Sequence, residues 1–111
     1  MSDDELRFDI DEIVRFGEIV RIRGRCTRGP IVRSDCFSRA YVPVRTYRAD
    51  GFDEVRTEDR DVQLEIVSIW AYRKEVPECS HGMTAELHAK GTGEDGLGMG
   101  YVLEGRHTKR D

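Results

Sequence analysis

The clearest pattern in the chain is the alternation of apolar and polar residues over 62–71. Every second residue from Val62 to Ile66 is apolar, and the opposite face changes from polar to apolar along the segment. A period of two is typical of a β-strand. The change from polar to apolar residues predicts that the opposite face of this strand is covered at one end. Proline lacks a backbone donor, so the strand should lead into a turn at 77–82 before residues 83–89 run back.

Similar signals recur along the chain. Residues 19–27 alternate between apolar residues and arginines, which predicts a strand with one solvated face. Residues 8–16 predict an extended segment, with a helical turn as the weaker alternative. Residues 36–47 are rich in β-forming residues, although Pro43 places this strand at an edge, a bulge or an end. Residues 101–104 predict a closing strand.

Three segments lack a core-forming pattern. Residues 48–61 carry charges of both signs with two apolar residues, which predicts a long charged loop. Residues 1–7 are predicted to be a disordered acidic N-terminus and residues 106–111 a polar tail. The remaining residues, 8–105, form one predicted domain. Short strands divided by turn residues, without a clear helix, predict an all-β fold that is a small antiparallel barrel or a sandwich.

Length and charge limit the classes of partner. The chain has 111 residues and a mass of 12.8 kDa, which is enough for one core. Its net charge of −4 argues against binding through diffuse attraction to nucleic-acid phosphates or anionic lipid. An acidic stretch follows Met1, and no apolar run approaches the roughly 20 residues that span a bilayer. We therefore expect a cytoplasmic protein without a membrane partner.

The cysteines give weak chemical signals. Cys26, Cys36 and Cys79 form an odd set without a CxxC motif, which fits reduced thiols in the cytosol, and we expect them to be small core residues. Together with His81 and His88 they offer thiolate and imidazole for zinc, but their spacing does not favour a metal site. Cys79 beside His81 lacks a third, orienting group. No metal, catalytic residue or enzymatic activity is therefore predicted.

A ridge of arginines is the first candidate binding surface. Arg21, Arg23 and Arg25 project from one strand face, and the aromatic side chains Tyr41, Tyr47 and Trp70 are available for stacking. This combination can contact RNA. The alternative is a solvated face that is neutralised across the sheet by acidic residues such as Glu86. We favour the solvated face, so RNA is open as a partner but is not the preferred one.

The charged segment is the second candidate surface. Phe52, Asp53 and Glu54 lie within the predicted loop at 48–61. Such charged segments are most often solvent-exposed, and the alternative is a surface that docks a protein. A glycine-rich stretch at 91–100 offers a GxGxxG spacing, but the residues after it are strand-like. A pyrophosphate site needs a helix there, so no nucleotide and no cofactor is predicted.

Several motifs occur in a family order. Residues 24–29, GRCTRG, are similar to a G-R-V-x-x-G hairpin, and residues 81–91 are similar to an A-G-x-x-V-x-L-x-L-x-G strand. Residues 99–103, MGYVL, match a closing R-G-x-V-L with methionine in place of arginine. Over residues 8–105 the chain resembles the second, β-barrel domain of elongation factor Tu and related translational GTPases, as a stand-alone domain.

The resemblance implies a barrel of the translation-protein type that binds a partner. The chain has no GxxxxGK[ST] loop, and therefore no phosphate cradle and no GTPase activity. In elongation factor Tu this barrel helps to hold the aminoacyl end of tRNA. Here Ile13 stands where an aromatic residue is expected and Thr84 where asparagine is expected, so carriage of aminoacyl-tRNA is not implied.

The expected function is that of a non-enzymatic binding module with a protein or ribonucleoprotein partner and a link to translation. The alternative is a small immunity or regulatory protein that binds a specific toxin or enzyme through the acidic segment at 48–61.

Overall fold

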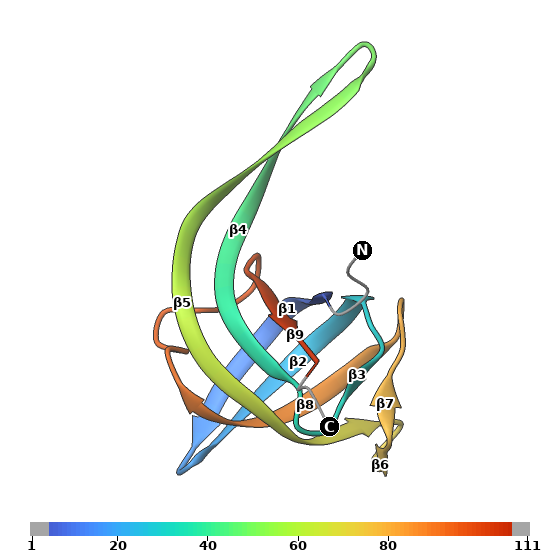
Figure 1. Cartoon of the computed structure of the whole chain (residues 1–111), viewed down its shortest axis with the longest axis vertical. Coiled ribbons are helices and arrows are strands. Elements are labelled where there is room, and N and C mark those ends of the chain that lie inside the picture. The colour runs from blue at the N-terminus through green and yellow to red at the C-terminus, as the bar shows by residue number, and fades with distance from the viewer. Residues whose placement is uncertain (1–4, 108–111) are drawn as a thin grey trace.

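A computed structural model of the chain describes residues 5–107, and every regular element within that range is a β-strand (Figure 1). The all-β prediction is therefore confirmed. The strands are β1 Glu5–Phe16, β2 Ile19–Arg28, β3 Ile31–Val32, β4 Cys36–Arg48, β5 Gly51–Ala71, β6 Lys74–Val76, β7 Glu78–Cys79, β8 Thr84–Thr92 and β9 Val102–Arg106.

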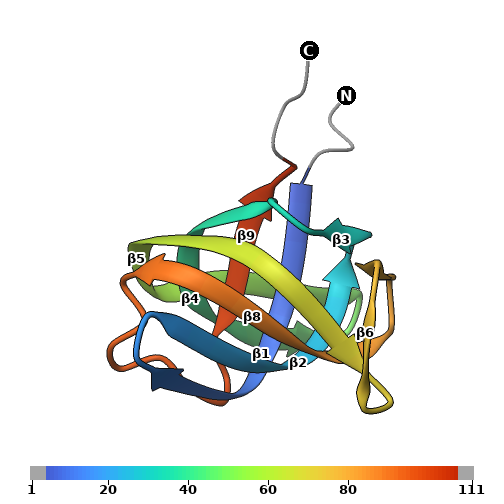
Figure 2. The same ribbon diagram turned by 90° about the horizontal axis from the view of Figure 1, so that it is seen from below.

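Six of the strands close into a ring (Figure 2). Their order is β4-β9-β1-β2-β8-β5, and β5 pairs in turn with β4, all in the antiparallel sense. Strand β6 extends the sheet beside β5, and β3 with β7 forms a separate two-stranded ladder. Closure satisfies the backbone groups that an open sheet would leave unpaired at its edges.

The core lies inside the ring and follows the alternation of the strands. On β2 every second residue is buried, and on β1 the same alternation holds as far as Ile10, as expected for strands with one solvated face. Large, fully buried side chains from all six strands of the ring and from β3 pack into one cluster: Phe8, Phe37, Leu6, Ile22, Ile31, Leu64, Ile66, Ile69, Leu87, Leu103 and Val20. Tyr41 is also fully buried but lies outside this cluster, with the guanidiniums of Arg7 and Arg56 over its ring.

Glycines allow neighbouring strands to approach closely at three places. A Cβ atom at Gly24 would overlap the carbonyl oxygen of Asp9 on β1, and one at Gly105 would overlap that of Cys36 on β4. At Gly91 the overlap would be with the carbonyl oxygen of Gln63 on β5, and the backbone also has a φ of +135°. The tight pairing of β2, β8 and β9 with their neighbours therefore depends on residues without a side chain.

The predicted loop at 48–61 is wrong, because this segment is the second strand of a long β-hairpin. Strand β4 pairs with β9 only as far as Tyr41, and β5 pairs with β8 only from Gln63 onward. Between these points β4 and β5 pair with each other alone. We call residues 42–61 the arm, and it extends away from the ring (Figure 1).

The arm carries few apolar residues because both of its faces are solvated, which is why its pattern resembles that of a loop. Cross-strand ion pairs accompany the backbone ladder instead, with 3.2 Å between Arg45 Nε and Glu54 Oε1 and 3.2 Å between Arg48 and Asp53.

The ends of the predicted domain also need correction. Strand β1 begins at Glu5, and Leu6 is fully buried, so residues 5–7 are not disordered. Residues 1–4 of the predicted disordered segment lie outside the described residues. Arg106 belongs to β9, and the Nδ1 atom of His107 lies 3.0 Å from both carboxylate oxygens of the buried Asp35. The rest of the predicted tail, 108–111, lies outside the described residues.

The interior predictions have mixed outcomes. The strands at 19–27 and 62–71 are confirmed, and 8–16 is extended rather than helical. The chain already reverses after Ala71, through Tyr72 and Arg73, earlier than the predicted turn at 77–82. Strands β5 and β6 pair there as an antiparallel hairpin, because the hydrogen bonding of β5 continues to the end of its apolar segment. Within the described residues no helix is long and apolar enough to cross a membrane.

An ion pair connects the glycine-rich stretch at 91–100 to the end of β1. Arg15 Nε donates to Glu94 Oε2 at 2.6 Å, and Arg15 Nη2 donates to the carbonyl of Gly91 at 2.6 Å. The hydrogen bond from Arg15 holds the pKa of the Glu94 carboxyl below its ordinary value. Since the pKa is lower in the folded state, the pair stabilises the fold above the ordinary pKa of glutamate and loses this contribution as the pH falls.

We expect the wild-type protein to lose more stability between neutral pH and about pH 3 than a Glu94→Gln variant, which cannot gain this proton. Urea denaturation at a series of pH values measures the difference. Glu18→Gln, which changes an exposed carboxylate in the β1–β2 turn, is the matched control and should follow the wild type. Identical pH profiles for wild type and Glu94→Gln would contradict this account of the pair.

Candidate binding surfaces

The arm displays apolar side chains on both of its faces. Val44 and Val55 are directly opposed on one face and are 46% and 57% exposed. Tyr47 and Phe52 are opposed on the other face and are 71% and 49% exposed, respectively. Their ring centroids lie 5.7 Å apart. The guanidinium of Arg45 lies 5.1 Å from the Phe52 centroid. These side chains contribute nothing to the core, and this makes them candidates for contact with another molecule.

The acidic residues of the arm are partly neutralised by arginines. Asp53 pairs with Arg48 at 3.2 Å, and Glu54 pairs with Arg45 at 3.2 Å and with Arg7 of β1 at 3.7 Å. Three arginines stand against six aspartates and glutamates over residues 48–61, so an excess of negative charge remains. The predicted residues Phe52, Asp53 and Glu54 therefore lie together near the tip of an element that projects from the ring.

The three predicted arginines lie on the exposed face of β2, and two of them meet carboxylates. Arg23 Nη1 lies 2.8 Å from Glu12 Oε1, and Arg21 Nε lies 3.8 Å from Glu86 Oε2. Arg21 also stacks on the ring of Phe16 with 4.5 Å to its centroid. Arg25 Nε donates to the carbonyl of Gly82 at 3.4 Å. These contacts favour a solvated, neutralised strand face over a ridge that binds RNA phosphates.

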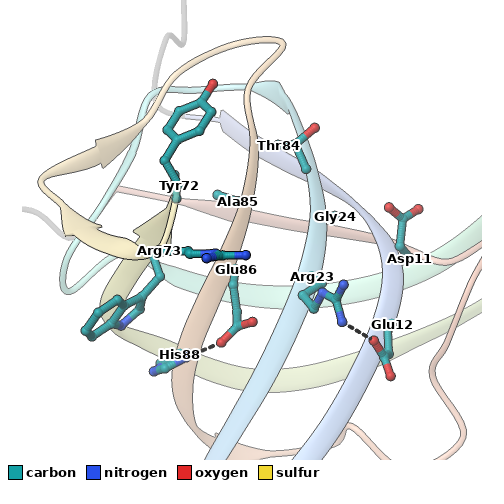
Figure 3. A pocket seen from close by; sticks show the side chains of 12 residues that line it. Asp11, Glu12, Arg23, Gly24, Tyr72, Arg73, Thr84, Ala85, Glu86 and His88 are labelled. Atoms are coloured by element: carbon teal, nitrogen blue, oxygen red, sulfur yellow. Dashed lines mark hydrogen bonds and ion pairs between the residues drawn. The ribbon is translucent and has the colours of Figure 1, made fainter.

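A shallow groove of about 830 Å³ joins this ridge to Trp70 (Figure 3). Trp70 Nε1 donates to Ser68 Oγ at 3.0 Å, and its ring lies 5.8 Å from that of His88. The groove brings together side chains from β1, β2, β5 and β8 and from the turn after β5. They are Asp11, Glu12, Arg23, Gly24, Trp70, Ala71, Tyr72, Arg73, Thr84, Ala85, Glu86 and His88.

The turn that borders the groove has an unusual backbone. Tyr72 and Arg73 have φ values of 53° and 67°, a region that costs energy for residues other than glycine. Both side chains are exposed. The groove holds carboxylates and cations side by side, among them the pair His88 Nε2 and Glu86 Oε2 at 2.7 Å, so its charge does not select one sign of ligand.

The seven predicted residues thus divide between two surfaces. Trp70 and Arg23 line the same groove, because β5, β8 and β2 are neighbours in the sheet. The arm residues 52–54 lie on an element that leaves the ring elsewhere (Figure 1). Val44 was not predicted to be exposed surface, and the opposed pairs on the arm were not foreseen. The dipeptide Asp50-Gly51 between β-forming residues was the available signal, since Asp-Gly is a preferred hairpin turn.

The cysteines do not gather into a larger cluster. Cys26 and Cys79 are buried as expected, whereas Cys36 is exposed, which corrects the prediction for that residue. A hydrogen bond with the Cys26 thiol, together with burial, raises the pKa of the Cys79 thiol, which opposes a reactive thiolate there. Over residues 5–107 no group of three or more histidine, cysteine, aspartate or glutamate side chains is placed to hold a metal ion.

The described residues thus offer two candidate binding surfaces, the arm and the groove. Comparison with family models, curated proteins and solved structures finds no match to this chain.

Proposed function

We propose that this chain is a non-enzymatic binding module that docks a protein or ribonucleoprotein partner through the tip of its arm. The observation that carries this proposal is the opposed pair Tyr47 and Phe52, exposed on a two-stranded element without a core of its own. Aromatic residues contribute large apolar area at a low entropic cost, and they dominate many protein interfaces. Arginine and carboxylate side chains around them supply a polar rim.

A link to translation rests on the order of the motifs and on the ring. We propose that the six-stranded ring is a small barrel of the type found in the second domain of elongation factor Tu, and that it works in the cytoplasm. The closed antiparallel order of the strands agrees with this proposal. Direct binding of RNA is not favoured, because Arg21 and Arg23 already meet carboxylates.

A regulatory or immunity protein is the second candidate function. It is favoured by the negative excess over residues 48–61, which lies beside the aromatic pair at the arm tip. A toxin or enzyme with a basic binding cleft would be attracted to such a surface and held by the aromatic pair. In this version the translational apparatus is not a partner.

A double variant Tyr47→Ala/Phe52→Ala tests the proposed docking surface. We expect it to bind the partner at least about tenfold more weakly than the wild type, because truncated aromatic anchors usually cost that much or more. The measurement is retention of tagged protein with purified ribosomes and total tRNA at low and physiological salt, together with capture from native cell extract. Tyr72→Ala is the matched control, because it removes an aromatic side chain that is 85% exposed in the turn after β5.

The outcomes separate the candidates. No retention of the wild type with ribosomes or tRNA at either salt concentration would exclude the link to translation. Capture of one enzyme or toxin from extract, lost in the arm variant alone, would support the regulatory version. Equal binding by the wild type and the arm variant would show that the tip is not the docking surface.

A further inference from the structure

Among residues 5–107, no other strand pairs with the two outer edges of the arm, and these edges are not equivalent. On the β4 side, Pro43 has no backbone N–H and blocks pairing of another strand. On the β5 side, residues 52–57 contain no proline, and the bulge at Glu58, with a φ of 54°, limits the segment at its lower end. A two-stranded ribbon without a core is at best marginally stable in water, so a third strand at this edge would add both hydrogen bonds and burial.

We propose that a second copy of this chain occupies the free β5 edge, so that the two arms form a four-stranded antiparallel sheet about a two-fold axis at Val55. In this register Val55 faces Val55 of the second copy, Glu54 faces Arg56, and Asp53 faces Thr57. The ladder covers residues 53–57 of each chain. Because the arms run antiparallel, the two rings lie at opposite ends of the sheet.

The side chains on each face support this register. On one face, Val44 and Val55 of each copy form a continuous row of four valines across the sheet, because Val44 is opposed to Val55 within each arm. On the other face, Arg45 is opposed to Glu54, and Arg56 of the second copy follows Glu54 in the row, while each Arg56 guanidinium also binds Glu104 of its own chain at 3.0 and 2.7 Å. The charges alternate along that row, and opposite charges on neighbouring strands stabilise a sheet.

Neighbouring registers are excluded by the same charges. A two-fold axis through an antiparallel pair places a residue opposite its own copy, so the axis can move only by whole residues. Centring it on the preceding residue would oppose two copies of Glu54, and centring it on the next residue would oppose two copies of Arg56. Like charges directly opposite each other destabilise a sheet. Val55 is the position that avoids both clashes.

This inference goes beyond the proposed function. It uses the edge of the arm and the valine face, whereas the proposed docking surface is the aromatic pair Tyr47 and Phe52. Failure of one therefore does not imply failure of the other. A protein that stays monomeric but still needs its aromatic pair for partner binding would overturn the dimer alone. A dimer whose partner binding ignores Tyr47 and Phe52 would overturn the docking surface alone.

Disulfide trapping tests the axis directly. In a Cys36→Ser background, Val55→Cys is expected to form a covalent dimer with diamide, because facing residues on antiparallel strands lie about 5 Å apart. Val44→Cys is the matched control, since Val44 is similarly exposed on the same face, but its two copies would be separated by three strand spacings, about 14 Å. We expect the Val55→Cys dimer to form at least tenfold faster than the Val44→Cys dimer. Equal rates would overturn the proposal.

A charge at the axis gives a second, non-covalent test by light scattering after gel filtration. The wild type is expected to have twice the monomer mass of 12.8 kDa. Val55→Glu should dissociate it, because two carboxylates would then face each other across the axis. Asp50→Arg, at the tip outside the ladder, should leave the mass unchanged. Circular dichroism checks folding of each variant. A wild type that is monomeric at every concentration, or a Val55→Glu variant that stays dimeric, would overturn the proposal.

Discussion

Gly91→Ala is expected to lower the free energy of unfolding by about 3 kcal/mol or more. An added Cβ would overlap the carbonyl oxygen of Gln63, which belongs to the backbone of β5 and cannot rotate away as a side chain could. The φ of +135° adds strain for any residue with a side chain. Most small domains are stable by 5–15 kcal/mol, so this single methyl group is expected to remove a large part of the total.

Gly98→Ala is the control for this substitution. A Cβ at Gly98 meets no atom within 4 Å, and the change is expected to alter stability by less than about 0.5 kcal/mol. Urea unfolding followed by the fluorescence of Trp70 measures both variants. Equal stability of the two would mean that β8 and β5 do not approach each other as closely as described. Failure of the Gly91 variant to fold, with normal folding of the Gly98 variant, would agree with the expectation.

Phe8→Ala is expected to cost about 3–5 kcal/mol of stability, the usual range for removal of a buried aromatic side chain. Phe8 is fully buried on β1, inside the ring. Removal of the aromatic side chain loses apolar burial and leaves a cavity. The surrounding strands can fill this cavity only in part, because they form a closed ring.

Phe16→Ala tests the same chemical change at the other end of the same strand. Phe16 is 55% exposed, and its main described contact is with the guanidinium of Arg21. We expect a loss of no more than about 1 kcal/mol, as for a cation–π contact at the surface. Thermal denaturation of both variants measures the contrast. Comparable losses at the two positions would contradict the placement of the core inside the ring.

The sequence predicted those strands that have one buried face. Burial imposes a period of two on residues 19–27 and 62–71, and this period is visible without any knowledge of the neighbouring strands. Leu6 continues the period of two formed with Phe8 and Ile10, but the acidic residues that precede it were given more weight, and its burial was not predicted. Its burial depends on β9, whose residues lie almost at the other end of the chain.

The arm could not be predicted by the same reasoning. Solvent lies on both of its faces, so hydrophobicity does not separate it from a loop, and its structure comes from pairing with β4 rather than from a core. The meeting of Trp70 and Arg23 in one groove was equally hidden, since it depends on the order β5, β8, β2 in the sheet. Spacing along the chain does not reveal which strands become neighbours. The arm's edges and the groove became visible only after the ring was known.

The position of β9 has a consequence for how the chain acquires its structure. This strand lies between β1 and β4 in the ring, and Glu5 at the start of β1 is opposed to Arg106 at its end. During synthesis, β1 and β4 both emerge long before the strand that joins them, so each keeps an unpaired edge through most of translation. Pairing between such distant segments is intrinsically slow. The time between emergence of β4 and closure by β9 is therefore when the nascent chain is most exposed to aggregation and has most need of a chaperone.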